Sequence, residues 1–160
     1  MTQVAANLKQ KEKAKHFYDL HHSGKLLILP NIWDPLGALL LEDLSFPAIA
    51  SASAAIAFTN GYDDGENIPF DSLLALLKKI VDSVNIPVSA DIESGFAQSD
   101  QQLIENIKQL LETGIVGINV EDTDKKTNSL LPVGLACERI RLIKKNFGRN
   151  GHLSFYQCPN

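Results

Sequence analysis

The chain lacks most of the features that would mark it as secreted, membrane-spanning or nucleic-acid-binding. Its only cysteines, Cys137 and Cys158, have neither metal-binding spacing nor a disulfide framework, so we expect free thiols. No apolar run approaches the roughly 20 residues that cross a bilayer, and residues 1–15 lack the apolar core of a secretory signal. A formal charge of −4 leaves no basic surface for phosphates. We therefore predict a soluble, cytoplasmic protein with no nucleic-acid or membrane partner.

The composition is that of a globular protein. Apolar residues make up 44% of the 160 residues and charged residues 21%, and this length suits a single domain over residues 1–160. Short apolar runs predict strands at residues 26–29, 48–53, 88–93, 116–121 and 152–156. Helical spacing of apolar residues predicts helices at residues 7–22, 70–84, 99–113 and 135–147. We expect Asp71 and Ser99 to cap the second and third helices, and Gly114 to end the third.

Alternating strands and helices are compatible with an open doubly wound sheet or a closed barrel. No glycine-rich, phosphate-binding turn follows the first strand. Polar and acidic residues instead recur where successive strands end, which is typical of barrels. Complete barrels run to about 250 residues, so the α/β chain is predicted to form an incomplete (β/α)8 TIM-type barrel, about its first half to five-eighths.

A pair of carboxylates at the end of one predicted strand carries the strongest chemical signal. Alternation along a strand would direct Asp91 and Glu93 to the same side. A carboxylate there is costly unless it is paired or bound to a metal. Glu121 ends the next strand in the same way, and Asp64 lies in the loop after the second strand. Acids converging from several loops favour a hard cation bound by oxygen, and Mg²⁺ is the natural candidate.

Other acids in these loops have an ordinary alternative. Asp63, Glu66 and Asp122 lie in predicted turns, where solvated carboxylates and helix caps are common. No histidine is expected beside the acidic strand ends, so the sequence indicates no histidine base. The histidines, which we expect at surface or packing positions, are His16, His21, His22 and His152.

Several motifs occur in an order that points to one family. They are Pro-Asn-Ile-Trp-Asp at residues 30–34, Ala-Ser-Ala-Ser at 50–53, Gly-Tyr-Asp-Asp-Gly-Glu at 61–66, Ser-Ala-Asp-Ile-Glu-Ser-Gly-Phe at 89–96 and Asn-Val-Glu-Asp at 119–122. Over about residues 16–145 the chain resembles the isocitrate lyase/phosphoenolpyruvate mutase superfamily. Within it, the chain is most similar to the phosphonomutase-like, carboxyvinyl-carboxyphosphonate phosphorylmutase-like branch.

The resemblance implies a magnesium-dependent lyase or mutase. It would break or form a C–C or P–C bond next to an α-keto acid through an enolate, on a small carboxylate or phosphonate substrate. The implied metal ligands are Asp91, directly, and Asp64, Glu93 and Glu121 through water. The implied catalytic residues are Asp64, Glu121 and Asn128. The implied substrate-binding residues are Trp33, Ser51, Ala52, Ser53 and Asp91, although plain packing is an equal alternative for Trp33.

The loop after Glu121 distinguishes the subclasses. Lyases of isocitrate or methylisocitrate resemble each other in a cysteine-containing segment, whereas this chain has Lys-Lys-Thr-Asn-Ser at residues 125–129. That string is similar to the gating loop of phosphonopyruvate-type mutases and hydrolases, in which the asparagine contacts the transferred group. Asn128 lies one residue closer to Glu121 than that pattern, and a solvated polar turn is the alternative.

The family pattern fails at residues 155–160. Where the family carries Asn-Ala-Arg-Thr, the sequence has Phe-Tyr-Gln-Cys-Pro-Asn. Codons that encode this tail give Ile-Asn-Ala-Arg in the next frame, so we expect a frame shift near Phe155 that truncates the chain. The intact family form is expected to be a homo-oligomer. The alternatives are a catalytically inactive remnant with a binding or assembly role, and a small open α/β binding module.

Overall fold

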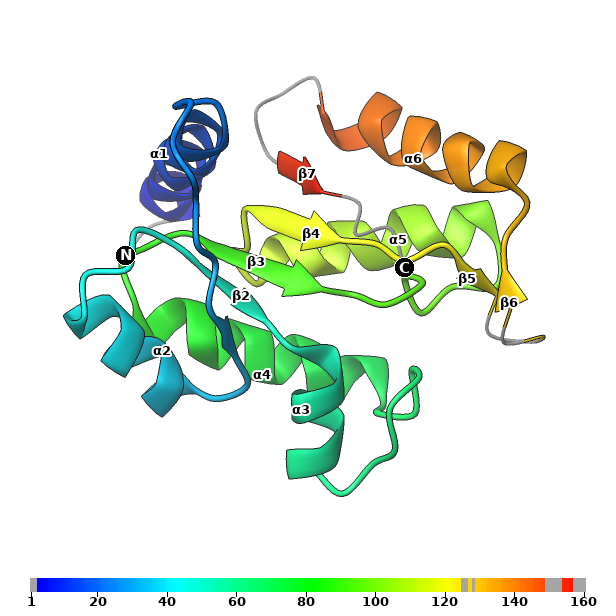
Figure 1. Cartoon of the computed structure of the whole chain (residues 1–160), viewed down its shortest axis with the longest axis horizontal. Helices are drawn as coiled ribbons and strands as arrows, with labels where there is room; N and C mark the ends of the chain where they lie inside the picture. Colours follow the sequence, from blue (N-terminus) through cyan, green and yellow to red (C-terminus); the bar gives the residue numbers. More distant parts are fainter. Residues whose placement is uncertain (1–2, 125–126, 128, 149–153, 157–160) are drawn as a thin grey trace.

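The computed structural model describes residues 3–124, 127, 129–148 and 154–156. Its centre is a five-stranded parallel sheet with strand order β1-β2-β3-β4-β7 (Figure 1). The strands are β1 (Asn31–Ile32), β2 (Ile49–Ser51), β3 (Val88–Asp91), β4 (Gly117–Asn119) and β7 (Ser154–Tyr156). Each strand pairs with the next one in this series, without the reversal of order that a doubly wound sheet has. The described chain therefore forms part of a barrel, as predicted.

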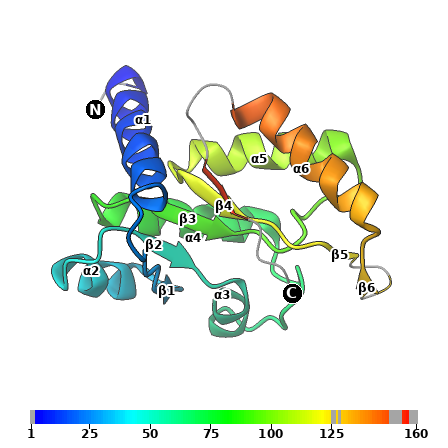
Figure 2. The same ribbon diagram turned by 45° about the horizontal axis from the view of Figure 1, so that its top comes forward.

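The first helix precedes the first strand, and the other helices lie in the connections between the strands of the sheet. The helices are α1 (Gln3–His21), α2 (Pro35–Asp43), α3 (Ser53–Thr59), α4 (Phe70–Ser83), α5 (Asp100–Glu112) and α6 (Val133–Phe147). Helix α2 packs beside α4, and α5 packs beside α6. The short helix α3 and the hairpin of β5 (Thr123–Asp124) and β6 (Ser129–Leu130) lie toward the carboxyl ends of the strands, whereas α1 lies toward the opposite end (Figure 2). Within the described residues, no helix is long and apolar enough to cross a membrane.

The core forms between the sheet and its helices. Ala90 of β3 and Ile118 of β4 are completely buried, as are Leu77 of α4 and Ile107 of α5. Both helices place leucine and isoleucine at helical spacing on one face, and that face packs against the apolar strands. A second, smaller cluster, which contains Phe17, holds α1 against the sheet.

Two of the three predicted helix ends are confirmed. The hydroxyl of Ser99 accepts a hydrogen bond of 3.2 Å from the amide of Gln102 at the start of α5. Gly114 follows α5 with φ +95°, a left-handed conformation that glycine adopts without steric cost. The prediction for Asp71 is wrong, because α4 begins at Phe70 with Pro69 at the N-cap, and Asp71 lies inside the first turn.

The prediction of a strand at residues 26–29 is also wrong. Leu26 is 90% exposed, and the first strand is β1, five residues later. Only Asn31 and Ile32 find partners on β2, in register with Ala50 and Ser51, so the ladder is no longer than two pairs. The other strand centres are confirmed with shorter ends, and residues 152–153 of the last predicted strand lie outside the described part.

Some elements were not predicted at all. Helix α2 has a clear signal in retrospect, since the Oδ1 of Asp34 accepts a 2.7 Å hydrogen bond from the amide of Gly37 and Pro35 occupies the first helical position. Helix α3 has no side-chain cap. The β5–β6 hairpin has only two residues in each strand, too few for a pattern of alternation.

Candidate active site

Asp91, the last residue of β3, is held by hydrogen bonds on each side. Its Oδ2 accepts bonds from the Ser53 amide at 3.3 Å and from the Ser53 hydroxyl at 2.7 Å. Its Oδ1 accepts one bond of 3.2 Å, from the amide of Glu93. The side chain remains partly exposed. Asp91 is therefore fixed in orientation at the carboxyl end of the sheet and is not completely buried there.

The serine-containing stretch after β2 is largely used to build this arrangement. The hydroxyl of Ser51 accepts a 2.9 Å bond from the amide of Asp91, and its side chain is almost completely buried. The amide of Ala52 donates to the carbonyl of Ile32 at 2.9 Å. These groups bond to the protein itself, so the role of Ser51, Ala52 and Ser53 in binding substrate stays a prediction.

Glu93 does not lie on the strand, so the expected alternation with Asp91 is wrong. Strand β3 ends at Asp91, and Glu93 has a left-handed φ of +49°. Its side chain is only 3% exposed, and its Oε1 accepts a 2.9 Å bond from the amide of Glu66. A buried carboxylate requires such hydrogen bonds, and Glu93 therefore joins the end of β3 to the loop before α4.

Glu121 and Asp64, the two remaining carboxylates that were predicted as metal ligands, lie in different surroundings. The amide of Glu121 donates to the carbonyl of Glu93 at 2.7 Å, and the Oε2 of Glu121 accepts a 3.2 Å bond from the Thr123 hydroxyl. Asp64 is exposed in the loop before α4, where its carbonyl accepts a 2.8 Å bond from the side chain of Asn67. The structure thus brings Glu121 next to the end of β3 and leaves Asp64 toward solvent.

The two remaining predicted site residues are Trp33 and Asn128. Trp33 is 44% exposed and lines a groove of about 320 Å³ with Asp34, Leu40 and Leu44. Its role in binding substrate stays a prediction. Asn128 lies outside the described residues, and its role stays a prediction.

The carboxylate oxygens at the strand ends suit a hard cation that binds directly to only one or two protein side chains. Among the residues that the structure describes, no three His, Cys, Asp or Glu side chains gather into a metal-binding group. The described side chains therefore do not form a site that would surround a cation with protein ligands alone. Mg²⁺ usually keeps several waters and uses one or two carboxylates, and the partly exposed Asp91 fits that mode of binding.

Two ionisable groups of α1 have a lowered pKa because they are partly buried. Burial lowers the pKa of His21, whose Nδ1 lies 2.8 Å from the carbonyl of Phe17. Burial likewise lowers the pKa of Lys13, which donates a 3.0 Å bond to the carbonyl of Val84. Helix α1 lies toward the end of the sheet opposite to the carboxyl ends of the strands (Figure 2). The absence of a histidine base stays a prediction.

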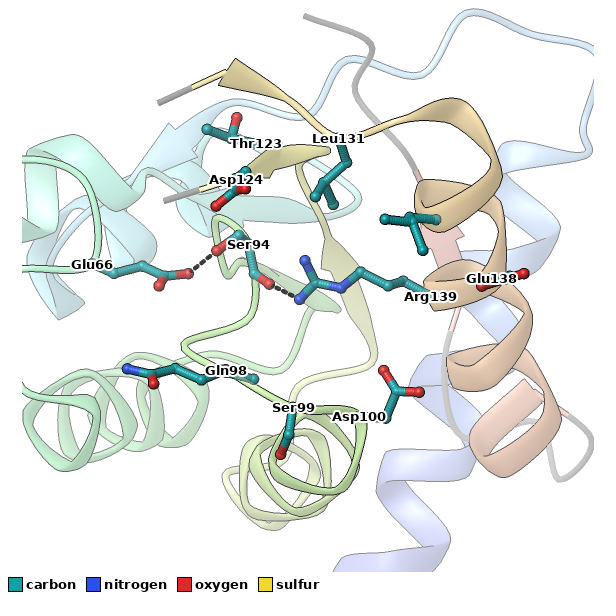
Figure 3. Close-up of a pocket in the computed structure, with 12 residues that line it drawn as sticks. Glu66, Ser94, Gln98, Ser99, Asp100, Thr123, Asp124, Leu131, Glu138 and Arg139 are labelled. Atoms are coloured by element: carbon teal, nitrogen blue, oxygen red, sulfur yellow. Dashed lines mark hydrogen bonds between the residues drawn. The ribbon is translucent and has the colours of Figure 1, made fainter. Parts of the chain in front are cut away.

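Two residues beside the cluster were missed as site residues. Glu66 and Arg139 line a cavity of about 360 Å³ next to the loop that follows β3 (Figure 3). Glu66 accepts a bond from the Ser94 hydroxyl, and the guanidinium of Arg139 donates to the Ser94 carbonyl. The acidic loop at residues 61–66 was a usable signal for Glu66. Arg139 carries no such signal, because its contact depends on how α6 packs.

The sequential order of the parallel strands places the chain among the (β/α)8-barrel proteins, and carboxylates at the strand ends are typical of that class. Residues 17–155 match the family described as phosphoenolpyruvate phosphomutase, and the chain belongs to that family.

The proteins that are similar to this chain are longer than the part of them that it covers. The 2-methylisocitrate lyase of Bacillus subtilis (strain 168) is 26% identical over 143 residues, which is 85% of this chain and 47% of the relative. A Burkholderia cenocepacia J2315 protein described as a phosphonomutase is 32% identical with a TM-score of 0.84, covering 91% of this chain and 61% of that one. A phosphonopyruvate hydrolase solved with oxalate and Mg²⁺ has a TM-score of 0.81 at 21% identity, over 91% and 52%. The chain spans about half the length of the curated relatives it matches.

Proposed function

We propose that the chain supplies the magnesium-binding side of the active site of a lyase or mutase. The enzyme would break or form a C–C or P–C bond next to an α-keto acid through an enolate. The observation that carries this proposal is the fixed carboxylate of Asp91 at the end of β3, held by both the amide and the hydroxyl of Ser53. Membership of the family agrees with it, as do the lyase and phosphonomutase among the relatives.

The proposed cofactor is Mg²⁺. Asp91 would hold it directly, and Asp64, Glu93 and Glu121 would support it through water. When bound, Mg²⁺ would supply a positive charge that stabilises the enolate oxygen formed as the adjacent bond breaks. Oxalate, which occurs with Mg²⁺ in the phosphonopyruvate hydrolase structure, resembles such an enolate and is a suitable probe.

The residues of the chain itself would bind and orient. Ser53 holds the Oδ2 of Asp91 and the amide of Glu93 holds its Oδ1, which fixes the orientation of the carboxylate. The backbone bond from Glu121 to Glu93 keeps the ends of β3 and β4 together. Asn128 would contact the transferred or cleaved group of a small carboxylate or phosphonate substrate. A cytoplasmic location and assembly into a homo-oligomer complete the proposal.

A second candidate function is binding without turnover. The chain covers 47% of the Bacillus lyase and 61% of the Burkholderia phosphonomutase. Residues that such relatives hold outside the matched region would then be needed for catalysis. A chain of this kind would bind Mg²⁺ and a carboxylate, or assemble with a partner, and would leave the substrate unchanged.

Calorimetric titration tests the proposed site. We expect oxalate to bind the chain saturably when Mg²⁺ is present and at least about tenfold more weakly when Mg²⁺ is removed with a chelator, because the cation would carry most of the attraction for the dianion. Acetate, which has one carboxylate and cannot chelate through two groups, serves as the control ligand. Absence of binding heat beyond that of Mg²⁺ and oxalate mixed without the chain would refute the proposal.

A further inference from the structure

Strained backbone is concentrated at one contact between two loops. Among the described non-glycine residues, positive φ values occur at Ser45, Glu66, Glu93 and Phe96. Three of these lie where the loop before α4 meets residues 92–99, which we call the strand-end loop. A left-handed conformation costs free energy for a residue with a side chain, and it persists only where neighbouring groups hold it. The strand-end loop must therefore be held in place by specific contacts.

Glu66 makes the contacts that join the two loops. Its Oε1 accepts a 2.6 Å bond from the Ser94 hydroxyl and a 2.9 Å bond from the amide of Phe96. In the other direction, the amide of Glu66 donates to the Oε1 of Glu93 at 2.9 Å. Each loop thus supplies a carboxylate to a backbone amide of the other. Charge-assisted bonds of this kind are stronger than bonds between neutral groups.

Two further side chains hold the strand-end loop from the opposite side. The guanidinium of Arg139, on α6, donates to the carbonyl of Ser94 (Figure 3). The amide group of Asn106, on α5, donates to the carbonyl of Gly95 at 3.1 Å and to that of Phe96 at 2.8 Å. Arg139 and Asn106 thus donate to carbonyl groups of the strand-end loop, whereas the Glu66 carboxylate accepts bonds from a hydroxyl and an amide of the same loop.

We propose that Glu66 is a positioning residue for the acidic strand end. Its carboxylate holds Ser94 and Phe96, and so fixes Glu93 in its left-handed conformation; the amide of Glu93 in turn bonds to Asp91. Glu66 would therefore set the orientation of the Asp91 carboxylate without touching a substrate. This inference rests on the proposed function for its consequence in binding, although the contact itself is independent of that function.

Hydrogen–deuterium exchange followed residue by residue tests the contact. In Glu66→Ala we expect the amide of Phe96 to exchange at least about tenfold faster, because it loses a charged acceptor. In Glu66→Gln, whose side-chain carbonyl still accepts, most of the protection should remain. The amide of Ile118 in β4 is the internal reference, since general destabilisation would accelerate both amides. Glu138→Ala is the matched control, because Glu138 lines the same cavity and is exposed.

Titration with Mg²⁺ and oxalate tests the consequence. We expect Glu66→Ala to weaken binding about tenfold, the scale found for residues that orient a metal ligand, with Glu66→Gln restoring most of it and Glu138→Ala unchanged. If the unmodified chain binds no Mg²⁺ and oxalate, the proposed function fails, and exchange at Phe96 alone decides the role of Glu66. Unchanged exchange at Phe96 in Glu66→Ala, or equal acceleration in Glu138→Ala, would overturn the inference.

Discussion

Asp91→Asn is expected to abolish binding of Mg²⁺ with oxalate, with an affinity loss of at least about 100-fold. Loss of a residue that merely supports a metal ligand typically costs 10–100-fold, so removal of the charged ligand itself should cost more. The asparagine carbonyl can still accept the bond from the Ser53 hydroxyl, which spans 2.7 Å in the unmodified chain. The NH2 group of the asparagine cannot accept the bond that the Glu93 amide gives to Oδ1, so calorimetric titration would report the loss of the charge together with this one bond.

The matched control for this substitution is Asp43→Asn. Asp43 is an exposed carboxylate at the end of α2, away from the strand ends, so the same change of charge is made without touching the site. We expect binding in Asp43→Asn to stay within about twofold of the unmodified chain, since exposed charges at this distance are screened. If Asp91→Asn and Asp43→Asn bind equally well, Asp91 is not the ligand.

Gly117→Ala should lower the free energy of unfolding by about 1–3 kcal/mol, the usual cost of overpacking a filled core. A Cβ at Gly117 would lie 2.6 Å from Cε1 of Phe17 and 2.9 Å from the Ser89 hydroxyl. Phe17 is completely buried between α1 and the sheet, so its ring has no room to move away. Urea unfolding followed by circular dichroism would measure the loss.

Gly134→Ala provides the comparison. Gly134 lies in the first turn of α6, and a Cβ there would meet nothing within 4 Å. Alanine is the better helix former, so this variant should be as stable as the unmodified chain or slightly more stable. Equal loss of stability in Gly117→Ala and Gly134→Ala would show that α1 does not pack on Gly117 as described.

The strand centres could be predicted from the sequence because buried parallel strands consist mostly of apolar and small residues, as Val-Ser-Ala at 88–90 and Val-Gly-Ile at 116–118 do. The ends of the strands could not be predicted in the same way. Alternation predicted that Glu93 shares a side with Asp91, but the strand stops at Asp91 because Glu93 turns into a left-handed conformation. The contacts that join this turn to the rest of the chain come from Glu66, 27 residues earlier, so the residues next to Glu93 carry no signal for it.

The candidate site could be predicted only in part, for a similar reason. Residue type and spacing predicted carboxylates at the strand ends, and Asp91 is the last residue of β3 while Glu121 lies two residues beyond β4; their roles stay predictions. Partners that depend on packing could not be identified. The contact of Arg139 with Ser94 depends on where α6 sits against the loop, and the use of the Ser53 hydroxyl by Asp91 depends on the register between β2 and β3.

The position of the cation can be measured directly with Mn²⁺, which prefers the same carboxylate ligands as Mg²⁺ and broadens the NMR signals of nearby amides. The amides of Ser53 and Glu93 both bond to the Asp91 carboxylate, at 3.3 Å and 3.2 Å. We predict that these two signals broaden first at substoichiometric Mn²⁺, before the signal of Asp82 on the surface of α4. Sharp signals from Ser53 and Glu93 while exposed acids such as Asp82 broaden would contradict a cation site at Asp91.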